Sequence, residues 1–308
     1  MSASAHRIAI VGAGSVGAAI ANALLYRRVA GHIVFTDIDA ARLHAQAQDL
    51  SDAAFLSNAR IHEGTARDAG QCDIIVISAG AKQRPEDTRL ALVQRNYEML
   101  RSVLGDMKPI RPDAILVLVA NPVDVLTFFA QKLSGLPKAQ VLGSGTFLDS
   151  TRLRSMLATK AQVADTAVHA YVLGEHGDSQ FVAWSSVTIG CTPLSTVLPL
   201  TADERSAIAT AAKDKALEII KVKGFTSYGV AAIVTSICES ILFDQRHVRP
   251  LSHWQEELQC CLSLPAVLGR NGIARTVELP LSEEEESLLQ ASASTMKDVI
   301  KSCETEPV

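Results

Sequence analysis

A glycine loop, IVGAGSVG, is the segment that most restricts how this chain can fold. Gly12, Gly14 and Gly17 give the spacing G-x-G-x-x-G. The apolar run Arg7–Val11 precedes them, and an apolar pattern of helical period, Val16–Tyr26, follows. The first glycine of such a loop permits a tight turn, and the third lets the helix pack closely on the strand. The segment therefore predicts a strand, a sharp turn and a helix at the start of a βαβ unit.

The rest of the first half continues this alternation of short apolar runs with longer helical patterns. Further strands are predicted at Ile33–Asp37, Asp73–Ala79, Ala114–Val119 and Gln140–Leu142. Helices are predicted at Asp39–Leu50, Leu90–Lys108 and Val123–Leu133. Near-continuous apolar strands separated by helices are typical of a parallel sheet that is covered on both faces. We therefore predict a doubly wound α/β domain of the Rossmann type over residues 1–143.

The second half, residues 144–308, has a different pattern and predicts an α+β domain. Helices are expected at Asp149–Lys160, Ala202–Lys223 and Tyr228–Phe243, with a last helix that follows Ser282 and ends near Lys301. Strands are expected at Val168–Leu173, Val248–Leu251, Leu258–Leu264 and Ala274–Leu279.

The glycine loop also predicts a ligand. The main chain at its second glycine is open to a pyrophosphate, and the helix that follows presents unpaired N–H groups to the phosphates. Asp37 ends the next strand, where its carboxylate can accept hydrogen bonds from an adenosine ribose and would repel the 2′-phosphate of NADP. The loop therefore predicts a dinucleotide site with NAD as the cofactor.

Composition excludes several other classes of function. The 308 residues are 48% hydrophobic and carry a formal net charge of −4, a balance that argues against nucleic acid or an anionic membrane as a partner. We see no secretory leader and no membrane span, and we expect a cytoplasmic protein. The cysteines have no spacing suited to a metal site, so we expect reduced thiols and no metal.

Polar residues gather where the predicted parallel strands end. The stretch 79–95 carries a series of cations, and Asn121 follows another strand of the same sheet. Asp149 and Arg152 stand at i and i+3 of a helix, and in the segment GEHGD His176 lies between two carboxylates. Because ligands bind at the carboxyl ends of the strands in open α/β sheets, these groups are candidates for one site.

With these segments in their order and spacing, the chain resembles the NAD-dependent L-lactate and malate dehydrogenases. The resemblance runs nearly end to end, through VGAGSVG, FTDID, AGAKQRPEDTRLALVQRN, ANPVDVLT, GSGTFLDSTRLR, VHAYVLGEHGDSQ, KGFTSYGVA and LPAVLGRNGI. It implies that His176 exchanges a proton with the substrate, that Asp149 stabilises the imidazolium, and that Arg89 polarises the ketone.

The same resemblance implies further site residues. Arg152 would bind the substrate carboxylate through two parallel N–H···O bonds, which lysine cannot make. Asn121 would contact substrate and nicotinamide, and Thr226 would line the substrate pocket, with Val230 one turn further on. Around NAD the matching positions are Gly12, Gly14, Val16, Gly17, Asp37, Arg42, Gly80, Ala81, Asn121 and Ser144.

The choice of acid depends on Gln83. Malate dehydrogenases carry arginine at this position, because a dicarboxylate brings a second charge that must be paired. A neutral glutamine favours pyruvate and L-lactate, since an unpaired buried carboxylate is costly. A shift of the loop by one residue would instead present Arg84 and favour malate, and a bulkier 2-oxo acid is a further alternative.

Two predictions concern regulation and assembly. Arg154 and His169 match positions that bind the activator fructose 1,6-bisphosphate in bacterial relatives, but relatives without this regulation carry such pairs too. The family also implies a homo-oligomer, for which we favour a tetramer and keep a dimer as the alternative. The long N-terminal arm that braces the tetramer in animal relatives is missing here, which removes one argument for the tetramer and keeps the dimer as an alternative.

Two other classes compete with the dehydrogenase interpretation. A non-catalytic relative that keeps the fold as a binding module would be expected to have lost part of the set Arg89, Asp149, Arg152 and His176, and all four are present. Short-chain dehydrogenases use a Tyr-x-x-x-Lys pair, which is absent from this sequence.

Overall fold

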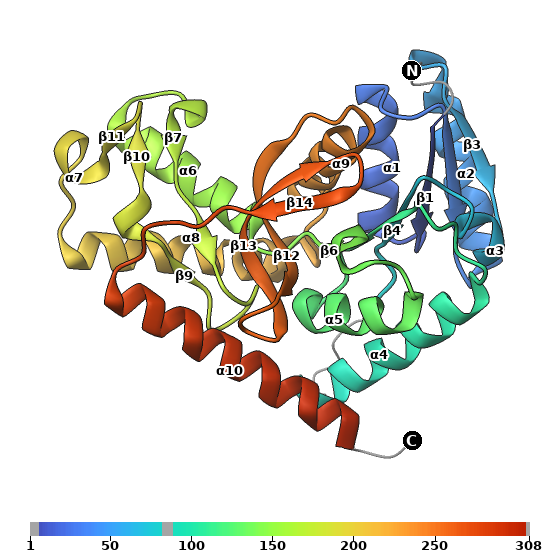
Figure 1. Ribbon diagram of the computed structural model, residues 1–308. Coiled ribbons are helices and arrows are strands. Elements are labelled where there is room, and N and C mark those ends of the chain that lie inside the picture. The colour runs from blue at the N-terminus through green and yellow to red at the C-terminus, as the bar shows by residue number, and fades with distance from the viewer. Residues whose placement is uncertain (1–5, 82–88, 306–308) are drawn as a thin grey trace.

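The computed structural model describes residues 6–81 and 89–305, while residues 1–5, 82–88 and 306–308 lie outside the description. The strands of its large sheet are β1 (Arg7–Val11), β2 (His32–Thr36), β3 (Arg60–Glu63), β4 (Ile74–Ile77), β5 (Ile115–Leu118), β6 (Val141–Gly143), β12 (His247–Gln255), β13 (Cys260–Gly269) and β14 (Gly272–Thr276). Within the described ranges this sheet has nine strands, in the order β14-β13-β12-β6-β5-β4-β1-β2-β3 (Figure 1).

The sheet is parallel in its first-half part and antiparallel in its second-half part. Strands β3, β2, β1, β4, β5 and β6 pair in parallel, as the alternating sequence pattern predicts. Strands β12, β13 and β14 extend it as antiparallel neighbours, with Ser252 paired to Gly143 at the junction. The Rossmann-type α/β class is therefore confirmed. The division into residues 1–143 and 144–308 stays a prediction, and the sheet continues across it.

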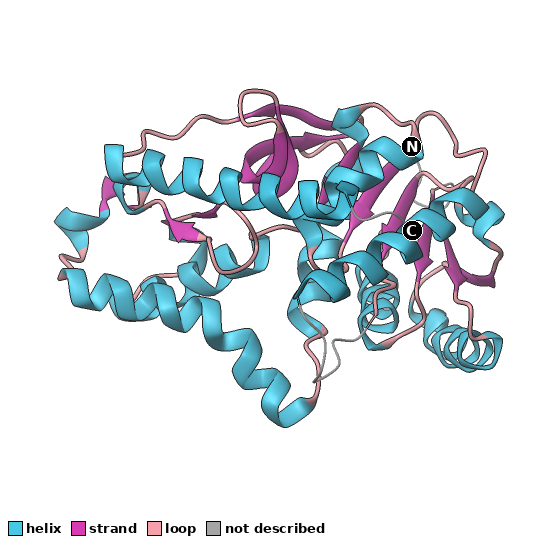
Figure 2. Cartoon of the chain, turned by 90° about the horizontal axis from the view of Figure 1, so that it is seen from below, coloured by secondary structure: helices cyan, strands magenta, loops and turns pink. Residues whose placement is uncertain are grey.

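Helices cover both faces of this sheet (Figures 1 and 2). One face carries α1 (Ser15–Arg27), α2 (Ala40–Ala53) and α9 (Tyr228–Leu242). The other carries α3 (Ala66–Ala69), α4 (Arg89–Asp106), α5 (Val123–Ser134) and α10 (Glu283–Thr305). Helix α10 runs along the lower edge in Figure 1 and packs on α4, α5 and β13, so it joins the two halves of the chain.

The strands form two cores because their side chains alternate between the faces. In β1, Ile8 and Ile10 pack on the side of α1 and α9, whereas Ala9 and Val11 pack on the side of α4 and α5. All four are buried. This burial on both faces explains why the strands are apolar throughout.

The remaining elements form a smaller region, seen at the left in Figure 1, around a core of its own. Its helices are α6 (Phe147–Ala161), α7 (Leu194–Val197) and α8 (Ala202–Lys223). Its strands are β7 (Val168–His169), β8 (Val172–Leu173), β9 (Phe181–Val182), β10 (Thr188–Ile189) and β11 (Thr192–Pro193). Short 3-10 turns η2 (Ala54–Leu56), η3 (Lys138–Gln140), η4 (Asp165–Ala167) and η5 (Trp184–Ser186) complete the chain. In the described part of the chain, no helix is both long and apolar enough to cross a membrane.

The prediction of one continuous strand over Val168–Leu173 was wrong, because β7 and β8 are separate. Side chains of α6 bind the main chain here in place of a neighbouring strand. Arg154 Nε donates to the carbonyl of Ala170, and Ser150 accepts the N–H of Val172. The predicted Rossmann strands also left out β3, whose sequence RIHE is polar because it lies at the edge of the sheet.

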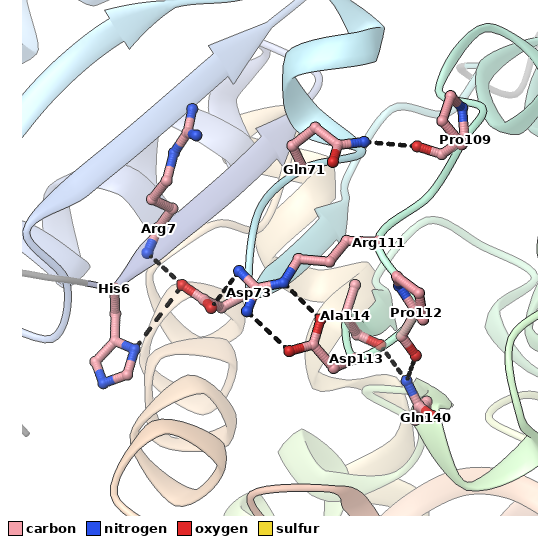
Figure 3. Close-up of polar contacts among 10 residues, drawn as sticks. All are labelled: His6, Arg7, Gln71, Asp73, Pro109, Arg111, Pro112, Asp113, Ala114 and Gln140. Carbon is pink, nitrogen blue, oxygen red and sulfur yellow. Dashed lines mark hydrogen bonds and ion pairs between the residues drawn. The ribbon is translucent and has the colours of Figure 1, made fainter.

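A polar cluster ties together the amino ends of β1, β4 and β5 (Figure 3). Asp73, next to β4, accepts the main-chain N–H of Arg7 at 2.7 Å and an N–H of Arg111 at 2.8 Å. Arg111 also pairs with Asp113, just before β5. The cluster lies at the amino ends of the strands, and the candidate site lies at their carboxyl ends, so the role of the cluster is structural.

We expect Asp73→Ala to lower the free energy of unfolding by about 1–3 kcal/mol, because it leaves an N–H of β1 and the Arg111 guanidinium without their acceptor. Urea unfolding measures this. Asp113→Ala, whose side chain is 68% exposed, is the control and should cost less. The KM for substrate should be unchanged in both variants, and a shift in KM would contradict a purely structural role.

Candidate active site

The glycine loop forms an open main-chain cradle between β1 and α1. Gly12 has φ +107°, and a Cβ on it would lie 2.7 Å from the main-chain nitrogen of Ala79. A Cβ on Gly17 would lie 1.9 Å from the carbonyl of Gly12, so side chains are excluded at both positions. Gly14 has nothing within 4 Å of its virtual Cβ. The second glycine therefore faces open space, and Val16 lies half-buried in the first turn of α1 beside it.

Asp37 holds this loop against the end of β2. Its carboxylate accepts the N–H of Ala13 at 2.6 Å and that of Asp39 at 2.9 Å. Arg42, in the first turn of α2, pairs with Asp39 at 2.7 Å and is exposed. Both predicted residues thus border the same carboxyl end of the sheet as the glycine loop.

A buried asparagine links two further loops at the carboxyl end of the parallel strands. Asn96 of α4 accepts the N–H of Ala81 at 2.7 Å through Oδ1. Its Nδ2 donates to the carbonyl of Asn121 at 2.8 Å. Asn96 is 3% exposed, so the segment Gly80–Ala81 after β4 and Asn121 after β5 are held at a set spacing.

Asp149 brings the candidate catalytic groups together. It is buried in the first turn of α6, and its Oδ2 accepts from Nδ1 of His176 at 2.7 Å. Its Oδ1 accepts from Arg152 Nη1 at 3.3 Å. Since Nδ1 faces a carboxylate, that nitrogen carries a proton, and Nε2 is the nitrogen that can exchange a proton with a ligand.

The segment GEHGD is anchored from several elements. Gly174 has φ +87°, and a Cβ there would lie 2.7 Å from the hydroxyl of Ser292 on α10. That hydroxyl accepts the N–H of Glu175 at 2.8 Å. Gly174 also exchanges two main-chain hydrogen bonds with Ser263 of β13. The glycine before the Glu-His pair is therefore required by its backbone conformation and by the close approach of α10.

These side chains line one cavity of about 120 Å³. Asn121, Arg152, His176 and Thr226 all border it, with Ser144 beside them. Gly145 and six apolar side chains complete the described lining: Val119, Leu148, Ala216, Ile220, Val230 and Ile233. The cavity is far larger than the ~10–15 Å³ that one water needs, so a small organic acid can lie between His176 and Arg152.

Two predicted residues fall at the limit of the description. Gln83 lies outside the described residues, and Arg89 is described as the first residue of α4.

The electrostatics of the cavity favour a protonated imidazole. Burial lowers the pKa of His176, but the charge of Asp149, its hydrogen bond and the charge of Asp124 together outweigh it, and Arg152 opposes them. The net result is a pKa raised above the ordinary value of 6.5. This arrangement has the parts of a general acid–base site beside a carboxylate-binding arginine.

Comparison with known proteins agrees with this geometry. Residues 6–143 match the model of the lactate/malate dehydrogenase NAD-binding domain, and residues 146–306 match that of the lactate/malate dehydrogenase alpha/beta C-terminal domain. The chain belongs to the lactate/malate dehydrogenase family. It is 46% identical to L-lactate dehydrogenase A of Rhizopus oryzae, over 95% of this chain and 92% of that protein.

Further members of the family are similar along the whole chain. The L-lactate dehydrogenase of Synechococcus sp. (strain JA-3-3Ab) is 41% identical, over 95% of this chain and 98% of that protein. The structure of the minor L-lactate dehydrogenase from Enterococcus mundtii superposes with a TM-score of 0.94 at 32% identity, covering 98% of this chain and 100% of that one.

The residues present fit the NAD of this family. The main chain at Gly14 is open, the first turn of α1 follows it, and Asp37 directly follows the next strand, β2. This cradle accepts a pyrophosphate without displacing a side chain. The structure thus provides a place for the cofactor that the sequence predicted.

Sequence reasoning missed three residues that hold the site: Asn96, Asp124 and Ser292. Asp124, in the first turn of α5, accepts the main-chain N–H of His176 at 2.7 Å. One signal was available, because Asp124 is an acidic residue between the valines of the segment ANPVDVLT, three positions after Asn121. Asn96 and Ser292 gave none, since single polar residues in helices are ordinary.

We expect the pH profile to follow His176. Reduction of a 2-oxo acid needs the imidazolium, so its kcat/KM should fall as pH rises through a pKa above 6.5. Oxidation of the hydroxy acid needs the neutral ring and should improve over the same range. The raised pKa also stabilises the fold, fully below pH 6.5 and less as pH passes the folded-state value. Steady-state rates in both directions test this, and profiles that move together would contradict it.

Proposed function

We propose that this protein is an NAD-dependent L-lactate dehydrogenase, which interconverts pyruvate and L-lactate. The observation that carries the proposal is that one cavity is bordered by both His176 and Arg152. The buried carboxylate of Asp149 accepts a hydrogen bond from each of them. Curated relatives named L-lactate dehydrogenase, 41–46% identical over nearly the whole chain, support the same activity.

Each protein group has a separate task in the proposed reaction. Bound NADH supplies the hydride. His176, fixed through Nδ1, gives the proton of Nε2 to the ketone oxygen as the hydride reaches the carbon. Arg152 binds the substrate carboxylate with the N–H groups that Asp149 leaves available. Arg89, at the start of α4, is proposed to stabilise the developing alkoxide.

The described cavity favours a monocarboxylate. Among the described residues that line it, Arg152 and His176 are the ionisable ones, and the first pairs the carboxylate while the second serves the ketone. A second carboxylate would lie against Val230, Ile233 and their apolar neighbours at a high cost in desolvation. Gln83, proposed to face the substrate methyl group, and Arg84, the source of the malate alternative, lie outside the described residues.

A substrate panel tests the proposal. The values of kcat/KM for pyruvate, oxaloacetate and 2-oxoisocaproate with NADH should rank pyruvate first. His176→Asn should reduce kcat by roughly 100- to 10,000-fold, because it removes the general acid. NADH fluorescence should report unchanged cofactor binding in that variant. A preference for oxaloacetate would favour malate, and normal turnover in His176→Asn would refute the assignment.

Basic side chains outside the lining of the substrate cavity support a second site, which would bind an anion. Arg154 Nε donates to Ala170, its guanidinium lies over the ring of Tyr171, and its Nη2 has no hydrogen-bond partner in the described part of the chain. Arg249 lies close enough that Arg154 lowers its pKa, after the larger effect of burial. His169 is exposed at β7. We propose that a phosphate group such as that of fructose 1,6-bisphosphate binds here.

If this anion site regulates the enzyme, millimolar fructose 1,6-bisphosphate should lower the pyruvate concentration needed for half-maximal rate. Arg154→Gln should remove the effect and leave the rate without activator unchanged, because Arg154 does not border the cavity. Saturation curves that coincide with and without the sugar bisphosphate would exclude the regulation.

We also propose a cytoplasmic homo-oligomer, a tetramer or a dimer. The support is a set of large apolar side chains left exposed on neighbouring elements. Tyr26 of α1, Phe55 of η2 and Tyr228 of α9 are 57%, 82% and 76% exposed. Such side chains commonly mark subunit interfaces.

A further inference from the structure

A second buried carboxylate contacts the catalytic segment from the side of the large sheet. Asp124 is 1% exposed in the first turn of α5. Its Oδ2 accepts the main-chain N–H of His176 at 2.7 Å. Within the described residues its Oδ1 has no hydrogen bond of ordinary geometry, and neither has the buried hydroxyl of Ser252 on β12.

This arrangement does more than accept one N–H. An asparagine could accept the same hydrogen bond without burying a charge. The start of a helix favours an acidic residue, but that effect does not require burial. Burial raises the pKa of Asp124 to about 6, although the Ser252 hydroxyl, the His176 N–H and the charge of His176 act in the opposite direction. Asp124 is thus largely ionised at neutral pH.

The main chain of the catalytic segment is held at two successive residues. The N–H of Glu175 donates to Ser292 of α10, and the N–H of His176 donates to Asp124 of α5. One anchor is neutral and the other is charged. The difference matters because Asp124 raises the pKa of the imidazole on the same residue.

We propose that Asp124 is a positioning residue for the proton transfer: its carboxylate fixes the main chain of His176 and places a second buried negative charge beside the imidazolium. The proposal rests on the lactate dehydrogenase function proposed above. The other charged groups that act on the imidazole of His176 are Asp149 and Arg152, both from α6. Glu175 of the same segment acts on Asp124. Helix α8 faces the cavity with the uncharged Ala216 and Ile220. Asp124 and Asp149 then both raise the pKa of the His176 imidazole.

The test separates charge from anchoring with two variants. Asp124→Asn keeps an acceptor for the N–H of His176 and removes the charge. Ser292→Ala removes the other anchor of the same segment and changes no charge. Histidine labelled with ¹³C at Cε1 allows the His176 signal to be titrated in the full-length, ligand-free protein, and His176→Asn identifies that signal.

We expect the pKa of His176 to fall by about one unit in Asp124→Asn, as for loss of a nearby opposite charge, and to stay unchanged in Ser292→Ala. For pyruvate reduction, the falling limb of kcat/KM against pH should move down by the same amount. A shift of one unit corresponds to an approximately tenfold lower rate on that limb. The KM for pyruvate at pH 6 should change little, because Arg152 is untouched.

Thermal stability gives an independent readout. The raised pKa of Asp124 means that its contribution to stability is complete below pH 3.8 and is lost as pH rises through about 6. Asp124→Asn should therefore melt at the same temperature as the unchanged protein or higher above pH 6, even while the activity falls. In Ser292→Ala, which removes an anchor and no charge, the change in melting temperature should not depend on pH.

Three results would overturn the proposal. One is a His176 titration that is identical in Asp124→Asn and the unchanged protein, and another is an equal fall in Asp124→Asn and Ser292→Ala. If Asp124→Asn does not fold, the unchanged protein decides, since its His176 signal should show a second, smaller inflection near pH 6. Absence of that inflection is the third. Failure to reduce pyruvate would refute the proposed function, but the titration would still report on Asp124.

Discussion

The site depends on one buried carboxylate, that of Asp149, which binds an imidazole with one oxygen and a guanidinium with the other. These two partners have opposite requirements. In the proposed reaction, His176 must exchange a proton, whereas Arg152 must stay charged and hold a carboxylate. By binding both, Asp149 sets the distance between the proposed proton donor and the proposed substrate-binding arginine. Its burial makes each interaction stronger than it would be in water.

The large sheet supports this arrangement through both of its parts. The parallel part brings the glycine loop, the segment after β4 and Asn121 to one edge, and Asn96 links the last two. The antiparallel part supplies Ser263 of β13, which binds Gly174 through the main chain and the N–H of Thr146 through its hydroxyl. One strand therefore holds both the histidine segment and the start of α6. The glycine loop and the His176 segment are thus both attached to the same sheet.

Much of this could be read from the chain. Burial on both faces makes the parallel strands apolar throughout. The predicted ends therefore lie within two residues of the observed ends for β1, β2, β4, β5 and β6. The helices α8 and α9 were predicted as closely, because the helical pattern of apolar residues extends over many positions in each. Predictions failed where side chains replaced a neighbouring strand, as between β7 and β8, and where an edge strand such as β3 was polar. Local patterns carry no record of such partners.

The sequence by itself determined the Rossmann-type alternation and the glycine loop, and it named His176, Asp149 and Arg152 as the candidates for the proton donor, its carboxylate and the substrate arginine. These features are local: each lies within a short motif whose residue types suit one chemistry. Only the tertiary structure decided that Asn96, Ser292 and Asp124 hold the site, since each acts on a segment from 15 to 117 residues away. It also decided which of the acidic residues are buried. The physical reason is that burial and long-range hydrogen bonds arise from how helices and strands pack, and spacing along the chain does not encode that packing in any readable form.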